Sequence, residues 1–199
     1  MYAETCPQYL LLDDGVYDQP FEKSAPYVLS PPLRKKEDQA ALWEGITDGT
    51  IQTVGTDHCP FNLKGQKDRG KNDFTRIPGG AGGIEHRLSL IFTYGVLSKR
   101  ISIEQFMMVI SENPAAIFGI KNKGKIQPGY DADLVIWNPD MESVISSKSH
   151  FQNCDTNIYE GMKITGNPEI TISKGKIAFS DGIINEEELS GNYLKRTVN

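Results

Sequence analysis

The ten residues that decide the fold class are Ile51-Gln52-Thr53-Val54-Gly55-Thr56-Asp57-His58-Cys59-Pro60. The first six are β-rich, and they follow a helix predicted over residues 36–47, which Asp48-Gly49 ends. A helix followed at once by a strand is the local order of an α/β unit. Asp57 therefore lies at the carboxyl end of a predicted strand, where α/β folds place catalytic groups.

The residues alone leave two interpretations of Asp57 open. It is either a catalytic carboxylate or an aspartate that caps the following turn. A histidine next to such an aspartate is more often a packing or hydrogen-bonding residue than a metal ligand, and we expect this role for His58. The remaining histidines, His86 and His150, form neither an HxH nor an HxxxH pair with it, so the chain contains no self-sufficient histidine zinc motif. We expect His86 to be structural or on the surface and His150 to lie in a polar linker.

A polar, glycine-rich segment over residues 62–83 follows the strand. A loop of that length in a compact domain is usually functional or disordered. It ends in Gly79-Gly80-Ala81-Gly82-Gly83 before a predicted helix, whose N-terminal amides could hold an anion. The run matches neither the P-loop nor the dinucleotide fingerprint. The glycine run before the helix still supports one hypothesis, a binding module that uses this loop.

The sequence pattern changes near residue 120, from helical spacing to short β-rich runs. Before that point, helical spacing predicts helices over 84–97 and after Ser102, which could cap the second one. Beyond it, short β-rich runs are separated by turn pairs such as Lys174-Gly175 and Asp181-Gly182. We therefore expect an α/β part over 1–119, a β part over 120–185 and a polar tail over 186–199.

Composition excludes several classes of protein. The 199 residues carry a net charge of -5 and include 19 Gly and 11 Pro, which argues against wholesale disorder and against a nucleic-acid partner. No apolar run approaches the roughly 18 residues of a membrane helix, and residues 1–5 do not resemble a signal peptide. We expect a cytoplasmic protein without a membrane partner, and reduced, mostly buried thiols at Cys6, Cys59 and Cys154.

Several motifs together carry a resemblance to one family. They are Glu4-Thr5-Cys6-Pro7-Gln8-Tyr9-Leu10, Ser30-Pro31-Pro32-Leu33-Arg34, Gly55-Thr56-Asp57-His58-Cys59-Pro60-Phe61, Ile77-Pro78-Gly79-Gly80, Ser111-Glu112-Asn113-Pro114-Ala115 and Gly129-Tyr130-Asp131-Ala132-Asp133-Leu134-Val135. In this order they resemble the dihydropyrimidinases and D-hydantoinases, cyclic amidohydrolases of the metal-dependent amidohydrolase superfamily. The similarity runs from residue 2 to about residue 184. It covers the C-terminal portion of that family only.

The resemblance implies a fold and a metal centre. The fold is an α/β one: the C-terminal part of a (β/α)₈ TIM-type barrel over 1–119, followed by part of a small β-sandwich over 120–185. In the family, two zinc ions are held by an HxH pair, a carboxylated lysine, two further histidines and an aspartate. Asp57 matches the aspartate, which implies roles as zinc ligand and general base. The other ligands have no counterpart in these 199 residues.

The resemblance also implies a substrate site. Ser30 matches a position whose backbone binds the substrate amide, and Gly79 stands where many members have an asparagine that contacts the ring through its backbone. The expected reaction is opening of a dihydropyrimidine or hydantoin ring by zinc-activated hydroxide, as in pyrimidine catabolism. We expect the 199 residues to be inactive alone, and to form a homo-oligomer, tetrameric in the family, or to associate with a companion N-terminal chain.

Two alternative functions accompany this expectation. Some relatives have lost metal ligands and act as non-enzymatic, dihydropyrimidinase-related scaffold proteins. An allantoinase- or dihydroorotase-like cyclic amidohydrolase is the other alternative. Dihydroorotases carry a second histidine where this chain has Cys59-Pro60-Phe61, which favours the dihydropyrimidine or hydantoin side.

Overall fold

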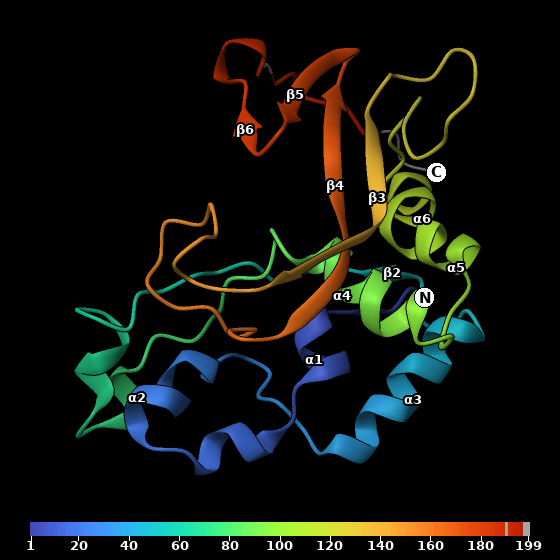
Figure 1. Ribbon diagram of the computed structural model, residues 1–199. Helices are drawn as coiled ribbons and strands as arrows, with labels where there is room; N and C mark the ends of the chain where they lie inside the picture. Colours follow the sequence, from blue (N-terminus) through green and yellow to red (C-terminus); the bar gives the residue numbers. More distant parts are fainter. Residues whose placement is uncertain (190, 197–199) are drawn as a thin grey trace.

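The chain forms two separate sheets, and the computed structural model describes residues 1–189 and 191–196. A parallel pair joins β1 (Glu4–Thr5) to β2 (Thr53–Val54), with Glu4 opposite Thr53 and Thr5 opposite Val54. The second sheet is antiparallel, in the order β3–β4–β5–β6. Figure 1 shows this second sheet standing above the helices that surround the parallel pair. Among the described residues, no helix combines the length and the apolar composition that a membrane span requires.

The crossover between β1 and β2 is helical, as parallel pairing requires a long connection. It contains α1 (Pro7–Leu11), η1 (Asp14–Asp18), α2 (Phe21–Ser24), η2 (Ala25–Tyr27) and α3 (Lys36–Thr47). The predicted helix over 36–47 is confirmed as α3. Its first turn is closed by Asp38, whose carboxylate accepts a hydrogen bond from the Lys35 amide at 3.1 Å. Such a cap satisfies an amide that has no partner inside the helix.

A second helical region follows β2. It comprises η3 (Lys67–Gly70), η4 (Phe74–Arg76), α4 (Arg87–Ile91), the π-helical η5 (Phe92–Leu97), α5 (Ile103–Met107), the π-helical η6 (Met108–Glu112) and α6 (Asn113–Ile117). Ser102 caps α5 as predicted: its hydroxyl accepts from the Gln105 amide at 3.2 Å, and the Gln105 side chain accepts from the Ser102 amide at 2.8 Å. This reciprocal capping box fixes where α5 begins.

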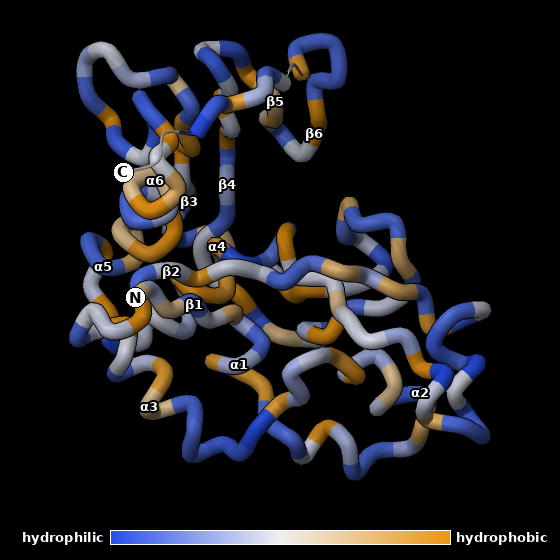
Figure 2. The backbone as a smooth tube through the Cα atoms, turned by 180° about the vertical axis from the view of Figure 1, so that it is seen from behind, coloured by the Kyte–Doolittle hydropathy of each residue, from blue (hydrophilic) through white to orange (hydrophobic). Residues whose placement is uncertain are grey.

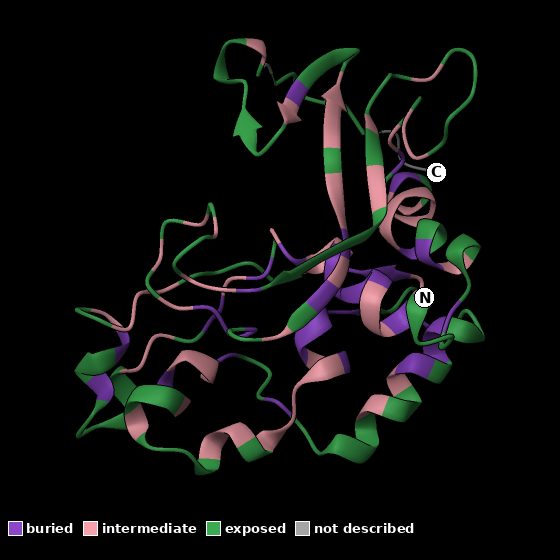
Figure 3. Ribbon diagram, in the orientation of Figure 1, coloured by how far each residue is buried: buried purple, intermediate pink, exposed green. Residues whose placement is uncertain are grey.

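Two apolar cores meet at α4. One contains Ile91 with residues of α1, α3, β2 and α5, and the other contains Leu90 with Ile145, Ile158, Tyr159 and Ile164 from the β3–β4 region. Leu90 and Ile91 are both fully buried, and burying such a side chain contributes about 1.5–3 kcal/mol. Figure 3 shows the buried residues gathered where α1, α4 and the lower part of β4 meet. Helix α4 therefore ties the parallel pair to the antiparallel sheet.

The antiparallel sheet consists of β3 (Leu134–Val144), β4 (Lys163–Ser173), β5 (Lys176–Ser180) and β6 (Ile183–Ile184). Lys174-Gly175 and Asp181-Gly182 form the predicted hairpin turns, and all four have positive φ, as a type I′ turn requires. Val135 and Ile136 are consecutive on β3, so they face opposite sides of the sheet, and they are 44% and 48% exposed. Figure 2 shows further apolar segments, in orange, on β5 and β6. Both faces of this sheet are thus partly uncovered.

Two local expectations need correction. Cys6 is buried, but Cys59 is exposed and Cys154 is only partly buried, because Cys59 lies in the loop beyond β2. The segment 62–83 is not one open loop, since η3 lies within it and buries Lys67. Strand β4 runs through residues 166–168 despite their weak β-propensity, because it pairs with the long β3. The tail contains η7 (Glu186–Glu188), and residues 190 and 197–199 lie outside the described residues.

Candidate active site at the carboxyl end of β2

Asp57 lies three residues beyond β2, in the loop at the carboxyl end of the parallel pair. Its φ is 48°, in the left-handed region that aspartate tolerates better than most residues. The side chain is exposed, and it makes no hydrogen bond or ion pair with the residues that the structure describes. The Asp57 carboxylate is therefore available to an external ligand.

His58 holds the end of the glycine-rich segment in place. Its Nδ1 atom accepts hydrogen bonds from the amides of Gly83, at 3.1 Å, and Ile84, at 3.3 Å. An accepting Nδ1 carries no proton, so the proton of the neutral ring is on Nε2. The predicted packing or hydrogen-bonding role of His58 agrees with this arrangement.

The Ser30 and Gly79 segments lie side by side next to this loop. The Gly80 amide donates to the Val28 carbonyl at 3.0 Å, and the Cys59 amide donates to the Ala81 carbonyl at 2.9 Å. A Cβ atom on Gly80 would lie 2.5 Å from the Cys59 carbonyl oxygen, so only glycine fits there. Ser30 and Gly79 are both exposed. The strand end and both predicted substrate segments thus form one hydrogen-bonded group.

Lys67 contacts the Ser30 segment through hydrogen bonds to its backbone. This role was not predicted from the sequence. The Lys67 side chain is 1% exposed and donates to the carbonyls of Pro26, at 3.2 Å, and Val28, at 2.8 Å. Burial lowers the pKa of Lys67 to about 8. A lysine in a polar loop gives no sequence pattern that distinguishes it from its exposed neighbours, so only the fold identifies it.

A buried chain of polar side chains connects the β3–β4 loop to the end of β2. The Tyr159 hydroxyl donates to Gln8 Oε1 at 3.2 Å, and Gln8 Nε2 donates to the Thr56 carbonyl at 3.4 Å. Tyr159 is fully buried, and burial raises its pKa well above the usual value. Burial also raises the pKa of the nearby Cys6 thiol to about 12, with further contributions from the negative charges of Glu4 and Asp57. The Cys6 thiol is therefore protonated and is not a nucleophile at neutral pH.

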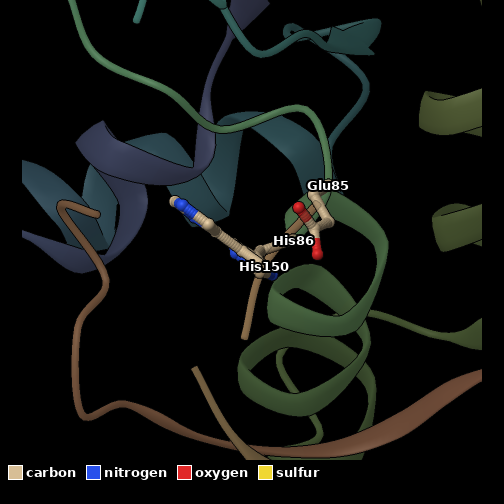
Figure 4. Close-up of side chains that lie close together, drawn as sticks. All are labelled: Glu85, His86 and His150. Carbon is tan, nitrogen blue, oxygen red and sulfur yellow. The ribbon is translucent and has the colours of Figure 1, made fainter. Parts of the chain in front are cut away.

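The structure also brings together three side chains that the sequence did not connect. Glu85 and His86 precede α4, and His150 belongs to the β3–β4 connection, yet their ligand-type atoms all lie within 4.8 Å of one another. Figure 4 shows the Glu85 carboxylate beside the two imidazole rings. The rings are stacked, with centroids 6.5 Å apart. Burial lowers the pKa of His86, an effect to which the neighbouring His150 adds and which Glu85 opposes.

Comparison with known proteins defines the class. The model of the Amidohydrolase family matches residues 10–178, and the chain belongs to this family. It is 44% identical to the D-hydantoinase of Geobacillus stearothermophilus over 197 residues and 41% identical to a D-phenylhydantoinase of Escherichia coli O1:K1 / APEC. These alignments cover 98% of this chain and 42% of each relative.

The solved structures agree with the sequence relatives. The chain superposes on the dihydropyrimidinase from Brevibacillus agri NCHU1002 with a TM-score of 0.91 at 43% identity, covering 92% of this chain and 40% of that one. The L-hydantoinase (dihydropyrimidinase) from Arthrobacter aurescens gives a TM-score of 0.81 at 32% identity. The resemblance predicted from the motifs is thus confirmed. The chain spans about two fifths of the length of the relatives it matches.

Proposed function

We propose that this chain supplies part of the active site of a cyclic amidohydrolase that opens hydantoin or dihydropyrimidine rings. That part contains the catalytic aspartate and two substrate-binding segments. The observation that carries the proposal is the position of Asp57. Its carboxylate is unpartnered among the described residues, at the carboxyl end of a parallel strand, and it adjoins the hydrogen-bonded segments that contain Ser30 and Gly79. Catalytic groups of barrel enzymes lie at this end of the strands.

The same proposal extends to the architecture. Residues 1–119 would be the last strands and helices of a (β/α)₈ barrel, residues 120–185 part of a β-sandwich, and residues 186–199 a tail. The parallel pairing of β1 with β2 across a helical crossover supports the first part. The change to an antiparallel sheet after α6 supports the second.

The amidohydrolase family is metal-dependent, and we propose zinc as the metal. A free carboxylate oxygen fits a zinc ligand, so Asp57 is chemically suitable, although a zinc site needs at least three protein groups. When bound, zinc supplies a hydroxide near neutral pH and polarises the ring carbonyl. The remaining ligands would come from residues outside these 199. We therefore propose that the 199 residues alone do not hydrolyse cyclic amides.

The residues of this chain would act in the following way. Asp57 would take the proton of the attacking water and deliver it to the departing ring nitrogen, since its carboxylate is unpartnered among the described residues. Ser30 and Gly79 would bind the ring amide through their backbone groups. The bond that breaks joins the ring carbonyl carbon to the ring nitrogen, and the products are a carboxylate and an N–H group. The substrate is thus a small cyclic amide.

A chimera tests this proposal. This chain would replace the matched part of the Geobacillus stearothermophilus D-hydantoinase. Ring opening of hydantoin, dihydrouracil, allantoin and dihydroorotate would then be assayed. We expect turnover of hydantoin or dihydrouracil by the chimera and none by the 199 residues alone. A folded chimera that opens only dihydroorotate or allantoin would support the allantoinase- or dihydroorotase-like alternative. A folded, inactive chimera would support the scaffold alternative.

A further inference from the structure

Glu85, His86 and His150 form a group to which the proposed reaction assigns no role. Glu85 and His86 come from the segment that enters α4, whereas His150 comes from the connection between β3 and β4 (Figure 4). We propose that these three side chains bind one divalent transition-metal ion of the zinc type. Two imidazoles and a carboxylate are ligands that zinc takes in proteins.

The hydrogen bond between His150 and a backbone carbonyl decides which of its ring nitrogens can accept a hydrogen bond or bind a metal. Its Nε2 atom lies 2.9 Å from the Cys154 carbonyl, and because a carbonyl only accepts, Nε2 carries the proton. The lone pair is then on Nδ1. Metal-binding histidines typically donate their other N–H to a carbonyl or carboxylate, which fixes the tautomer and the ring orientation. His150 already has this arrangement.

Asn157 shows that the two imidazole lone pairs converge. Its Nδ2 group lies 2.8 Å from His86 Nε2 and 3.4 Å from His150 Nδ1, and it donates to both. The orientation of the amide is fixed, since its Oδ1 atom accepts from the Tyr159 amide at 2.9 Å. The partly positive amide hydrogens therefore occupy a point that both lone pairs face. A cation placed there would be held by the same two nitrogens.

Glu85 supplies the third ligand in a fixed position. Its carboxylate accepts from the Phe151 amide, at 2.9 and 3.1 Å, and from the Gln152 amide at 3.3 Å. An ionised carboxylate has about four lone-pair sites, so it keeps capacity for a metal. Ligand atoms around tetrahedral zinc lie about 3.3 Å apart, so the three groups need to close by roughly 1.5 Å at most. His86 is buried and His150 is partly exposed, which leaves a route from solvent.

The test is zinc titration of the untagged 199-residue chain by calorimetry, together with the visible spectrum of its Co²⁺ form. We expect one zinc ion per chain and a tetrahedral cobalt spectrum without thiolate charge-transfer bands. Glu85→Gln and His150→Ala should each weaken binding by at least about tenfold. Asp57→Asn is the matched control and should bind zinc as the unaltered chain does, which separates this site from the proposed active site.

A variant that misfolds can lose zinc binding, but it does not bind zinc more tightly. A variant with a higher expected affinity therefore separates misfolding from loss of the site. Asn157→Asp keeps the oxygen that accepts from the Tyr159 amide, and it replaces the competing NH₂ group by a carboxylate oxygen. We expect this variant to bind zinc about tenfold more tightly than the unaltered chain. The proposal is overturned if the chain binds no zinc, if binding is lost in Asp57→Asn alone, or if Asn157→Asp binds zinc no better than the unaltered chain.

Discussion

Gly79 and Gly80 are neighbours that differ in their tolerance of a side chain. A Cβ atom on Gly79 would meet nothing within 4 Å. Gly80 has a φ of 148°, and a Cβ atom there would lie 2.5 Å from the Cys59 carbonyl oxygen. We expect Gly79→Ala to leave stability and chimera turnover near the unaltered values, since Gly79 is proposed to act through its backbone. Gly80→Ala should lower the free energy of unfolding by at least about 2 kcal/mol, because the conformation is open only to glycine. Urea unfolding of both variants measures the difference in stability, and equal free energies of unfolding for the two variants would contradict the prediction.

Lys67 makes stability depend on pH in a predictable direction. Its pKa is about 8 in the folded chain and 10.5 ordinarily, so between these values the unfolded chain binds more protons. Below about pH 8 the buried amine is charged, and its burial costs stability in full. From about pH 8 toward 10.5, the Lys67 contribution to the free energy of unfolding rises by about 1.4 kcal/mol per pH unit. Cys6 acts oppositely at high pH, since its raised pKa costs stability above its ordinary value of 9.0. The measurement must therefore be a difference between variants.

Lys67→Met removes the titrating group and keeps a long side chain. We expect the unfolding free energy of the unaltered chain to rise with pH relative to this variant, as followed by tryptophan fluorescence in urea. The exposed Lys64→Met is the control, and its difference from the unaltered chain should be flat over the same pH range. A flat difference for Lys67→Met as well would show that the amine is not buried as described.

At the scale of elements, sequence predicts best where the structure depends on local contacts. The bounds of α3, the cap at Ser102 and the turn at Lys174-Gly175 each depend on residues within a few positions, and all three are confirmed. The beginning of β4 and the meeting of His86 with His150 depend on residues far apart in the chain. Such contacts leave no periodicity or spacing for a sequence pattern to detect.

The Ser102 cap provides a prediction at this scale. Ser102→Ala removes the acceptor of the Gln105 amide and should lower the unfolding free energy by about 1 kcal/mol. Ser149→Ala is the control, because its hydroxyl is exposed and makes a single 3.4 Å contact with the Ser146 carbonyl. Denaturant unfolding should show no change for the control, and a Ser102→Ala midpoint equal to it would contradict the role of the cap.

At the scale of the whole molecule, the antiparallel sheet is the least protected part. Val135 and Ile136 on β3 and Ile183 on β6 are all 44% or more exposed, and β3 pairs only with β4 among the described strands. Open edges and uncovered apolar faces promote association. We expect the 199-residue chain to self-associate with increasing concentration in analytical ultracentrifugation. Val135→Lys should shift it toward monomer, and a concentration-independent monomer of the unaltered chain would contradict this.

The central claim is that Asp57 belongs to the active site of a cyclic amidohydrolase, and turnover by the D-hydantoinase chimera tests it most directly. The account predicts hydantoin or dihydrouracil opening that falls by about 10²–10⁴-fold in Asp57→Asn, since general acid–base groups contribute about that much. Asp18→Asn, an exposed aspartate in η1, should turn over normally. Equal turnover of the Asp57→Asn and Asp18→Asn chimeras would contradict the account.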